Sequence, residues 1–325
     1  MTLKKRFFLV GFGIILFAII APAIVLFARG YYFDWQNFRI VATGILSIKT
    51  EPRDVEIYLN GKFVEVTQKP IRFLLSGEYE VVLKKDGYLP WKKRIRIYDD
   101  LVTNLPESSD KKIYLFKETK IQSAISTTTR YLLENERGVF FLEKDNIFHF
   151  DMDYTTKTLV ATTSQATISS QDIGDEAVAP KAGIAIPVPG RRPYLILDNI
   201  LYEDSENRKK INDSVNYAFW NAQAKMLVYG NTHDIWILEP EKSQDSRLIT
   251  RSTKILGVPA FNPLTYYLFV SEDKEIKAVE VDSLGQPNVY TLATIQNQNV
   301  KLAVNSNGSR LLYLDGQNLY VLKFR

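Results

Sequence analysis

The chain has 325 residues, enough for two ordinary domains and an anchor. It contains 18 Phe, 18 Tyr and 4 Trp, a composition that favours half-buried β-strands, and no cysteine, which excludes disulfides, thiolate metal sites and a cysteine-linked lipid anchor. Four of the 41 basic residues flank the first apolar segment, and the remaining 37 balance the 37 acidic residues. A nucleic-acid-binding protein is therefore not expected.

An uncharged apolar segment of 22 residues runs from Phe7 to Ala28. As a helix it would extend about 33 Å, enough to cross the hydrocarbon core of a bilayer. Basic residues precede it and aromatic residues follow it, so the segment is predicted to be a transmembrane helix with its N-terminus in the cytoplasm. The residues expected at the two membrane interfaces are Lys4, Lys5, Arg6, Tyr31, Tyr32 and Trp35.

A cleaved signal peptide is the alternative, with small residues around Ala21 and Ala23 as its cleavage region. The apolar run is longer than a signal peptide needs and continues past these alanines to Phe27, which favours a retained anchor. We therefore expect a single-pass protein of the cell membrane with most of the chain outside the cytoplasm. Its first parts are a cytoplasmic stub over 1–6, a transmembrane helix over 7–28 and a juxtamembrane linker over 29–43.

Residues 44–117 show the alternation of a small β-sandwich. Val55, Ile57 and Leu59 share one face of a predicted strand. Asn60-Gly61 follows as a strong hairpin signal, because both residues tolerate a positive φ. The other predicted turns are Ser76-Gly77 and Asp86-Gly87.

The order of these turns resembles the PEGA domain. The matching residues are Thr50-Glu51-Pro52, Asn60-Gly61, Thr67, Pro70, Gly77-Glu78-Tyr79 and Lys85-Asp86-Gly87-Tyr88. The resemblance implies a small β-sandwich of extracytoplasmic or surface proteins, often beside a membrane anchor, and it carries over neither an activity nor a ligand site. Arg53-Asp54 stands where the family has Gly-Ala, and because this pair is expected in a turn, the fold should be unaffected.

A basic and aromatic stretch near the end of this domain has two interpretations. It contacts anionic lipid headgroups or an acidic wall polymer, or it is the solvated face of two adjacent strands, with Tyr88 and Trp91 packing at their ends. The nearby acids Asp86, Asp99 and Asp100 favour the solvated face. The stretch consists of Lys84, Lys85, Tyr88, Trp91, Lys92, Lys93, Arg94 and Arg96.

Residues 118–325 contain a repeat of roughly 40 to 47 residues. Asn221, Asn262 and Asn305 are 41 and 43 residues apart, and the strands that follow them keep the same spacing. Five such units of short strands predict a β-propeller-like domain, and they resemble the WD40-like and periplasmic TolB-type propellers, although the WD dipeptide is absent. The last unit ends without its fourth strand, so residues around Ile121 to Ile125 are expected to supply it and close the ring.

The sequence offers little catalytic machinery. Of the two histidines, His149 is expected in a strand and His233 in a turn, and there is no G-x-S-x-G motif. Asp151-Met152-Asp153 begins like a calcium loop but lacks the glycine and the closing glutamate. We therefore predict no catalytic residue, no cofactor and no metal site.

The expected fold class is all-β with one N-terminal transmembrane helix, a small β-sandwich and a propeller of about five blades. The leading hypothesis is a non-enzymatic binding or scaffold protein of the cell envelope, whose propeller binds a partner protein or a wall glycan through its loops. The longest predicted loops run from Ser164 to Glu176 and from Glu203 to Asp213. The rival hypothesis is an extracytoplasmic hydrolase or lyase with carboxylates in the central channel of the propeller.

Overall fold

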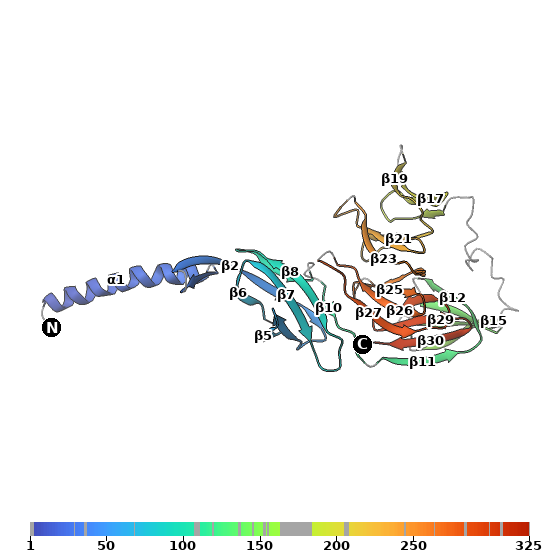
Figure 1. The fold of residues 1–325 in the computed structure, drawn as a ribbon, viewed down its shortest axis with the longest axis horizontal. Coiled ribbons are helices and arrows are strands. Elements are labelled where there is room, and N and C mark those ends of the chain that lie inside the picture. Colours follow the sequence, from blue (N-terminus) through green and yellow to red (C-terminus); the bar gives the residue numbers. More distant parts are fainter. Residues whose placement is uncertain are drawn as a thin grey trace. The chain divides into compact units, whose positions relative to one another are not determined.

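The described residues form one helix followed by β-strands, in two compact units (Figure 1). The first unit is Met1–Leu115 with Ser283–Gln286, and the second is Phe116–Asp282 with Pro287–Arg325. The predicted mostly β fold is confirmed, with one N-terminal apolar helix, a small sandwich and several four-stranded antiparallel sheets consistent with propeller blades. The computed structural model describes residues 3–28, 30–35, 38–67, 69–106, 111–118, 120–135, 138–144, 146–151, 154, 156–162, 184–204, 208–243, 245–262, 264–282, 285–298, 300–305 and 308–324.

The apolar N-terminal segment forms helix α1 (Leu3–Ala28). Its window Gly11–Ala28 has a mean hydropathy of 2.6 and is long and apolar enough to cross a membrane, by length and composition. The helix contains Pro22. On a scale of membrane-insertion free energy, the many apolar residues of the helix outweigh the unfavourable contribution of this proline.

The predicted linker over 29–43 differs from the structure, which has a β-hairpin there. Strand β1 (Tyr31–Asp34) pairs antiparallel with the first part of β2 (Arg39–Ile48), from Tyr31 opposite Ala42 to Asp34 opposite Arg39. The same strand β2 then continues into the sandwich, so the hairpin and the sandwich share one sheet.

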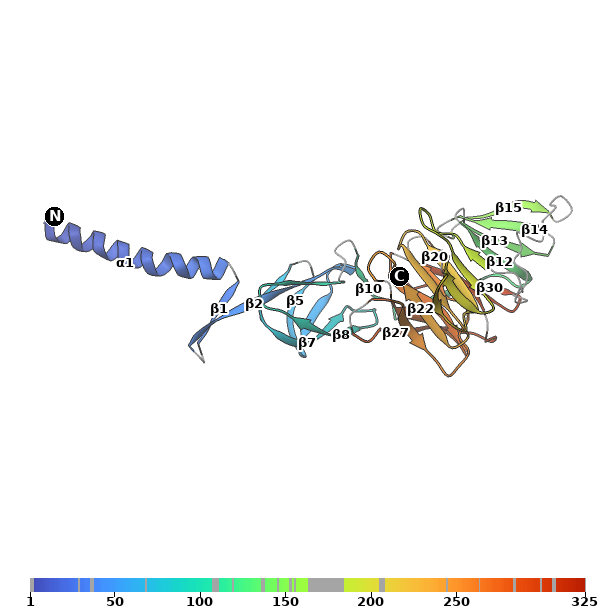
Figure 2. The ribbon, with the colours of Figure 1, turned by 90° about the horizontal axis from the view of Figure 1, so that it is seen from above.

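The sandwich consists of two four-stranded sheets, whose strands are visible in Figure 2. One sheet has the order β1-β2-β6, with β9 parallel to β2, and the other has the order β5-β4-β7-β8. A separate parallel pair joins β3 and β10. The bounds are β3 (Thr50–Glu51), β4 (Glu56–Leu59), β5 (Lys62–Val66), β6 (Ile71–Leu75), β7 (Gly77–Lys84), β8 (Trp91–Ile97), β9 (Val102–Leu105) and β10 (Ile113–Tyr114).

The core of the sandwich is formed by alternate residues of these strands. Val55, Ile57 and Leu59 are buried together, as their spacing predicts. The hairpin at Asn60-Gly61 is also present, with φ angles of 48° and 78°. The turn at Ser76-Gly77 is no hairpin, because β6 and β7 belong to different sheets and the chain crosses between them there.

The second unit contains five four-stranded antiparallel sheets among its described residues, in the manner of propeller blades. Four of them are formed by consecutive strands. They are β12 (Thr129–Asn135), β13 (Gly138–Glu143), β14 (Asn146–Phe150) and β15 (Lys157–Thr162); β16 (Ile184–Ile186), β17 (Tyr194–Leu197), β18 (Ile200–Glu203) and β19 (Lys209–Asn212); β20 (Tyr217–Asn221), β21 (Met226–Gly230), β22 (Asp234–Leu238) and β23 (Arg247–Arg251); and β24 (Ala260–Asn262), β25 (Tyr267–Glu272), β26 (Glu275–Glu280) and β27 (Val289–Thr294).

The repeated asparagines have a common structural role between the first two strands of a sheet. The side-chain oxygen of Asn221 accepts a hydrogen bond from the backbone N–H of Ala224 at 2.9 Å. Asn262 accepts one from Thr265 at 3.1 Å and Asn305 one from Ser309 at 2.9 Å. Asparagine side chains stabilise turns in this way, so the sequence repeat records a repeated turn.

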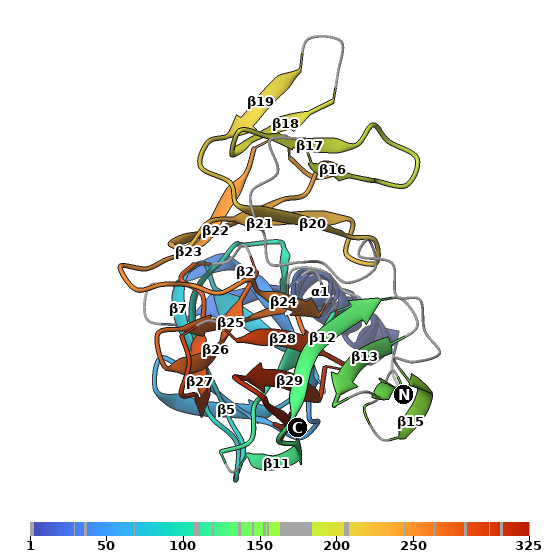
Figure 3. The ribbon, with the colours of Figure 1, turned by 90° about the vertical axis from the view of Figure 1, so that its right-hand side faces the viewer.

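The fifth sheet combines both ends of the unit. Strands β28 (Lys301–Val304), β29 (Arg310–Asp315) and β30 (Asn318–Lys323) pair in order, and β11 (Ile121–Ser126) pairs with β30. Figure 1 labels β29, β30 and β11, and Figure 3 shows β28, β29 and β11 from another side. The predicted origin of the fourth strand is confirmed. Buried clusters join β16–β19 to β20–β23, β20–β23 to β24–β27, and β28–β30 to β12–β15. Closure of the complete ring stays a prediction.

Truncating Leu319 tests the contribution of this fifth sheet. Leu319 lies in β30 opposite Ser126 of β11, is fully buried and packs against Leu132 and Phe141 of the next sheet. We expect Leu319→Ala to lower the free energy of unfolding by about 2–5 kcal/mol, because it leaves a cavity. Denaturant unfolding of the full chain in detergent measures this. Leu264→Ala, at a side chain that is 41 % exposed, is the control and should cost much less. Equal losses would contradict the assigned role of β30.

Candidate functional site

The end of α1 is packed onto the sandwich. The ring of Phe27 stacks on that of Phe73, with 4.8 Å between centroids and 29° between planes. The carbonyl oxygen of Phe27 accepts a hydrogen bond from the N–H of Gly30 at 3.0 Å. The hydroxyl of Thr43 in β2 donates to the carbonyl oxygen of Gly30. The helix end is thereby connected to two strands of one sheet.

The tip of the β1–β2 hairpin presents large aromatic side chains to solvent. Trp35 is 70 % exposed and Phe38 is 79 % exposed. Both pack edge to face against Phe33, with centroids 4.6 and 6.2 Å away. Because Tyr31 pairs with Ala42 beside the helix end, the four-residue strand β1 carries this tip about 13 Å along the hairpin from that point.

The loop before β9 adds further exposed apolar side chains beside the helix end. A small cavity of about 140 Å³ is lined by Phe27, Phe73, Leu101 and Val102, among others. Leu101 is 58 % exposed and Val102 is 54 % exposed. We name the exposed apolar side chains around the end of α1 the apolar collar; they are Tyr32, Trp35, Phe38, Ile40, Tyr98, Leu101 and Val102.

The residues predicted for the two membrane interfaces coincide only partly with this collar. Tyr32 and Trp35 belong to the collar, and Tyr31 is half-buried in β1. Lys4, Lys5 and Arg6 lie on the first turns of α1. The sequence analysis missed Phe38 and Ile40, although they follow the same aromatic run, and it missed Leu101 and Val102, which approach the helix end only in the folded sandwich.

The structure divides the basic stretch of β8 between the two faces of its sheet. Trp91 is fully buried in the sandwich core, and Lys93 is 3 % exposed. Their selection as surface contacts was wrong, because strand alternation turns both side chains inward. Lys92 and Arg94 point outward, as alternation requires.

The outward side chains of this stretch contact neighbouring strands. The ammonium of Lys92 lies 2.8 Å from a carboxylate oxygen of Glu80. Lys84 lies over the ring of Tyr58, 4.9 Å from its centroid. Lys85 donates to the carbonyl oxygen of Arg53 at 2.6 Å. Tyr88 is half-buried against the core. These contacts support the solvated-face interpretation of the stretch.

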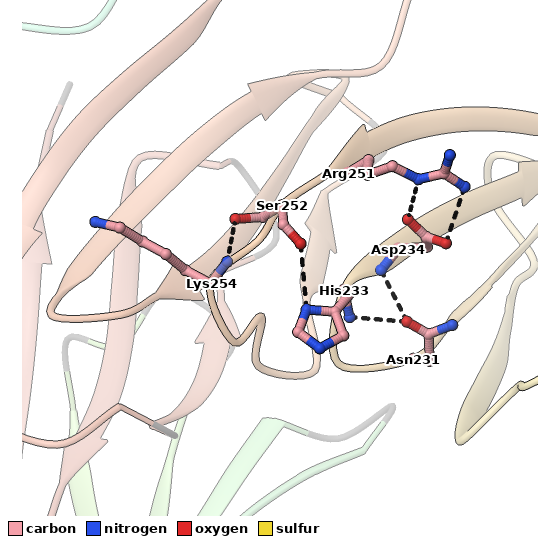
Figure 4. A network of polar contacts seen from close by, with 6 residues as sticks. All are labelled: Asn231, His233, Asp234, Arg251, Ser252 and Lys254. Atoms are coloured by element: carbon pink, nitrogen blue, oxygen red, sulfur yellow. Dashed lines mark hydrogen bonds and ion pairs between the residues drawn. The ribbon is translucent and has the colours of Figure 1, made fainter.

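His233 lies in a polar corner between β21 and β23 (Figure 4). The side-chain oxygen of Asn231 accepts hydrogen bonds from the N–H groups of His233 at 2.8 Å and Asp234 at 2.9 Å, which is a turn role as predicted. Nδ1 of His233 lies 3.2 Å from the backbone carbonyl oxygen of Ser252. Arg251 binds both carboxylate oxygens of Asp234, at 2.7 and 3.1 Å.

The Ser252 hydroxyl in this corner is occupied by structural contacts. It donates to Glu272, which also pairs with Lys277, and it accepts the N–H of Lys254 at 3.0 Å. Burial alone would raise the pKa of Glu272, but the hydrogen bonds from Lys277 and Ser252 outweigh it and lower that pKa. His233 therefore approaches the backbone of Ser252 and not its hydroxyl, which gives no serine–histidine pair here.

The same arrangement recurs in the sheet β12–β15. The hydroxyl of Ser126 and the ammonium of Lys157 each donate to Glu143, both at 2.6 Å, and Ser126 accepts the N–H of Thr128 at 3.3 Å. The hydrogen bonds from Lys157 and Ser126 hold the pKa of Glu143 below its ordinary value. Glu272 in β25 and Glu143 in β13 thus each connect their strand to the segment that precedes the same sheet.

Several predicted elements are placed or left open by the structure. His149 lies in β14, where its ring packs against Phe140 at 4.7 Å, so it is a strand histidine. In the described part of the chain, no group of three or more His, Cys, Asp or Glu side chains has a metal-binding arrangement. The loop Glu203–Asp213 contains strand β19. Met152, Asp153 and the loop Ser164–Glu176 lie outside the described residues.

Replacing Glu143 tests the electrostatic role of this carboxylate. Its folded-state pKa is depressed, so its stabilising contribution is present above the ordinary value of 4.5 and is lost as pH falls through the folded-state value. We expect Glu143→Gln to cost about 1 kcal/mol or less at pH 7 and to cost less as pH falls below about 4.5. Thermal unfolding at several pH values measures this. The control Asp213→Asn removes an exposed ion pair to Lys210 and should have little effect at any pH. A cost of Glu143→Gln that is independent of pH would contradict the assignment.

Residues 43–108 match the PEGA domain, which confirms the predicted resemblance for the sandwich. No curated protein matches the chain. Solved structures with similarity include a luciferin-regenerating enzyme (10 % identity, 61 % of this chain and 77 % of that chain, TM-score 0.31) and Kluyveromyces lactis Hsv2 (11 %, 72 % and 67 %, 0.31). A chain in a mitotic checkpoint complex is similar at 12 % identity over 61 % of this chain and 95 % of that chain, with a TM-score of 0.30. The propeller-like assignment rests on the five sheets themselves.

Proposed function

We propose that this chain is a membrane-anchored, extracytoplasmic binding or scaffold protein of the cell envelope. Helix α1 is its retained anchor, the PEGA sandwich stands next to the membrane, and the propeller-like unit presents loops to a partner protein or a wall glycan. The proposal is non-enzymatic, in keeping with the turn and strand roles of the two histidines.

The apolar collar is the observation that carries the proposal. Large apolar side chains cost free energy when they are exposed to water, and clusters of them mark interaction surfaces. Here they surround the end of the helix that is apolar enough to span a membrane. Tyr and Trp side chains favour the bilayer interface, where an aromatic ring and a polar group are both accommodated. A retained α1 would bring the collar to that interface, whereas a released protein would leave it in water.

The fate of the N-terminus separates an anchor from a signal peptide. We expect intact mass spectrometry of the protein from a membrane fraction to find residues before Ala21 retained, because the apolar run continues past the small residues. The chain should also resist extraction by alkaline carbonate, since about 20 apolar residues hold it in the bilayer. A mature chain that begins near Ala21 or Ala23 and is released by the wash would contradict the anchor.

The absence of cysteine makes single labels unambiguous for testing the collar. We expect nitroxide labels on Phe38→Cys and Leu101→Cys, in the full chain in phosphatidylcholine nanodiscs, to be more accessible to oxygen than to a water-soluble nickel complex. The matched control is Asp86→Cys. Asp86 lies just beyond Lys84, the last residue of β7, which is about 23 Å along the strand from Gly77. Gly77 pairs with Ile97, which precedes the loop that carries Leu101. Equal accessibility profiles at all three positions would contradict interfacial placement.

A further inference from the structure

The sandwich has an open cavity of about 370 Å³ whose lining is strongly basic. Among the described residues, nine line it, of which four are basic and none is acidic. They come from three separate segments: Lys49 and Arg53 flank β3, Lys69 lies between β5 and β6, and Lys112 precedes β10. We name Lys49, Arg53, Lys69 and Lys112 the basic pocket.

Buried hydrogen bonds hold these three segments together. The hydroxyls of Thr50 and Thr67 lie 3.1 Å apart, which ties the first segment to the second. Thr67 also accepts the N–H of Val55 at 3.0 Å. The N–H of Ile113 donates to the carbonyl oxygen of Lys49 at 2.8 Å, which ties the first segment to the third. The backbone of the pocket is therefore preorganised, while its long cationic side chains extend from it.

The pocket concentrates positive charge on a body that is formally neutral. Lys112 pairs with Glu51 at 3.0 Å, and Lys49 also has an interaction partner. The Lys85 ammonium, bonded to the carbonyl oxygens of Arg53 and Asp54, adds a further cation beside the turn. Converging cations in a concave surface raise the local concentration of anions, and an Arg among lysines adds a planar donor for phosphate or carboxylate.

The pocket is separated from the helix end along β2. Thr43 contacts Gly30, two residues beyond the end of α1, and Lys49 lies six residues further along the extended chain, about 20 Å away. Headgroup layers extend only about 5–8 Å beyond the hydrocarbon core on each side. A ligand outside the lipid headgroups therefore fits the site better than a lipid.

We propose that the basic pocket binds an anionic glycopolymer of the cell wall through its phosphate or carboxylate groups. The cavity has the volume of a small-molecule site, which suits one charged unit of such a chain, and it is open to solvent. The inference rests on the proposed extracytoplasmic position of the body and names a ligand class for it. Arg53 supplies its guanidinium from the turn where the PEGA pattern has Gly-Ala.

Isothermal titration calorimetry on the full chain in phosphatidylcholine nanodiscs tests the proposal. The probes are a poly(glycerol phosphate) chain, polygalacturonate and neutral dextran, each at 50 and 300 mM salt. We expect at least one anionic polymer to bind, no binding of dextran, and weaker binding at high salt because screening shortens the reach of the charges. Failure of both anionic polymers to bind would overturn the proposal. Since the titration does not depend on topology in the cell, it is independent of the anchoring test.

A charge-matched pair of variants distinguishes the pocket from general electrostatic attraction. Lys49→Gln with Lys69→Gln removes two pocket charges, whereas Lys92→Gln with Arg94→Gln removes two charges from the outer face of β8. We expect the pocket variant to weaken binding at least tenfold and the β8 variant less than twofold. Equal weakening would overturn the assigned site. If the pocket double variant melts at a lower temperature, Arg53→Gln, at an exposed turn, replaces it.

The source of the anion is identified by two further titrations. Inorganic phosphate should bind at least tenfold more weakly than the polymer, because it offers a single charged group. Phosphate that binds as tightly would overturn the polymer assignment. Nanodiscs that contain anionic lipid should leave polymer binding unchanged within twofold. If anionic lipid instead competes with the polymer, and this competition disappears in the Lys49→Gln, Lys69→Gln variant, the pocket binds lipid headgroups and the proposal is overturned.

Discussion

The pairing of β11 with β30 is the constraint on which the second unit depends. It joins residues about 200 positions apart, from Ile121 opposite Lys323 to Ser126 opposite Leu319, and completes the fifth sheet with four strands. Without it, β30 and β11 would each expose an unpaired edge. Phe116, just before β11, reinforces the junction, because its buried ring contacts Tyr267 and Phe324 at 4.9 and 5.3 Å. A protein without disulfides relies on such packing to hold its ends.

Much of this architecture could be predicted because its signals are local. The apolar run defines α1, alternation defines the strands, and the spacing of Asn221, Asn262 and Asn305 records turns that the structure confirms. Even the long-range origin of β11 followed from a missing strand. Each inference needed only the chemistry of one segment, or a count of strands in a repeat.

The surfaces were harder to predict because they depend on which segments meet. Trp91 and Lys93 look like parts of a basic patch in sequence, yet alternation along β8 buries both. Leu101 joins the collar only because β9 pairs with β2. The basic pocket combines residues from positions 49 to 112, whose proximity depends on sheet pairing and on the Thr50–Thr67 contact. No spacing rule in the sequence reports such convergence.

The β1–β2 hairpin has a mechanical consequence for an anchored body. A domain that is attached to the membrane by a single transmembrane helix can rotate about that helix and tilt. If the proposed anchoring holds, a hairpin tip in the same bilayer, on a strand that continues into the sandwich sheet, provides a second point of attachment. Two attachment points resist rotation about the helix axis and transmit torque from the sandwich to the membrane. The sandwich would then hold a constant azimuth above the lipid surface, and the proposed polymer ligand would run in a defined direction.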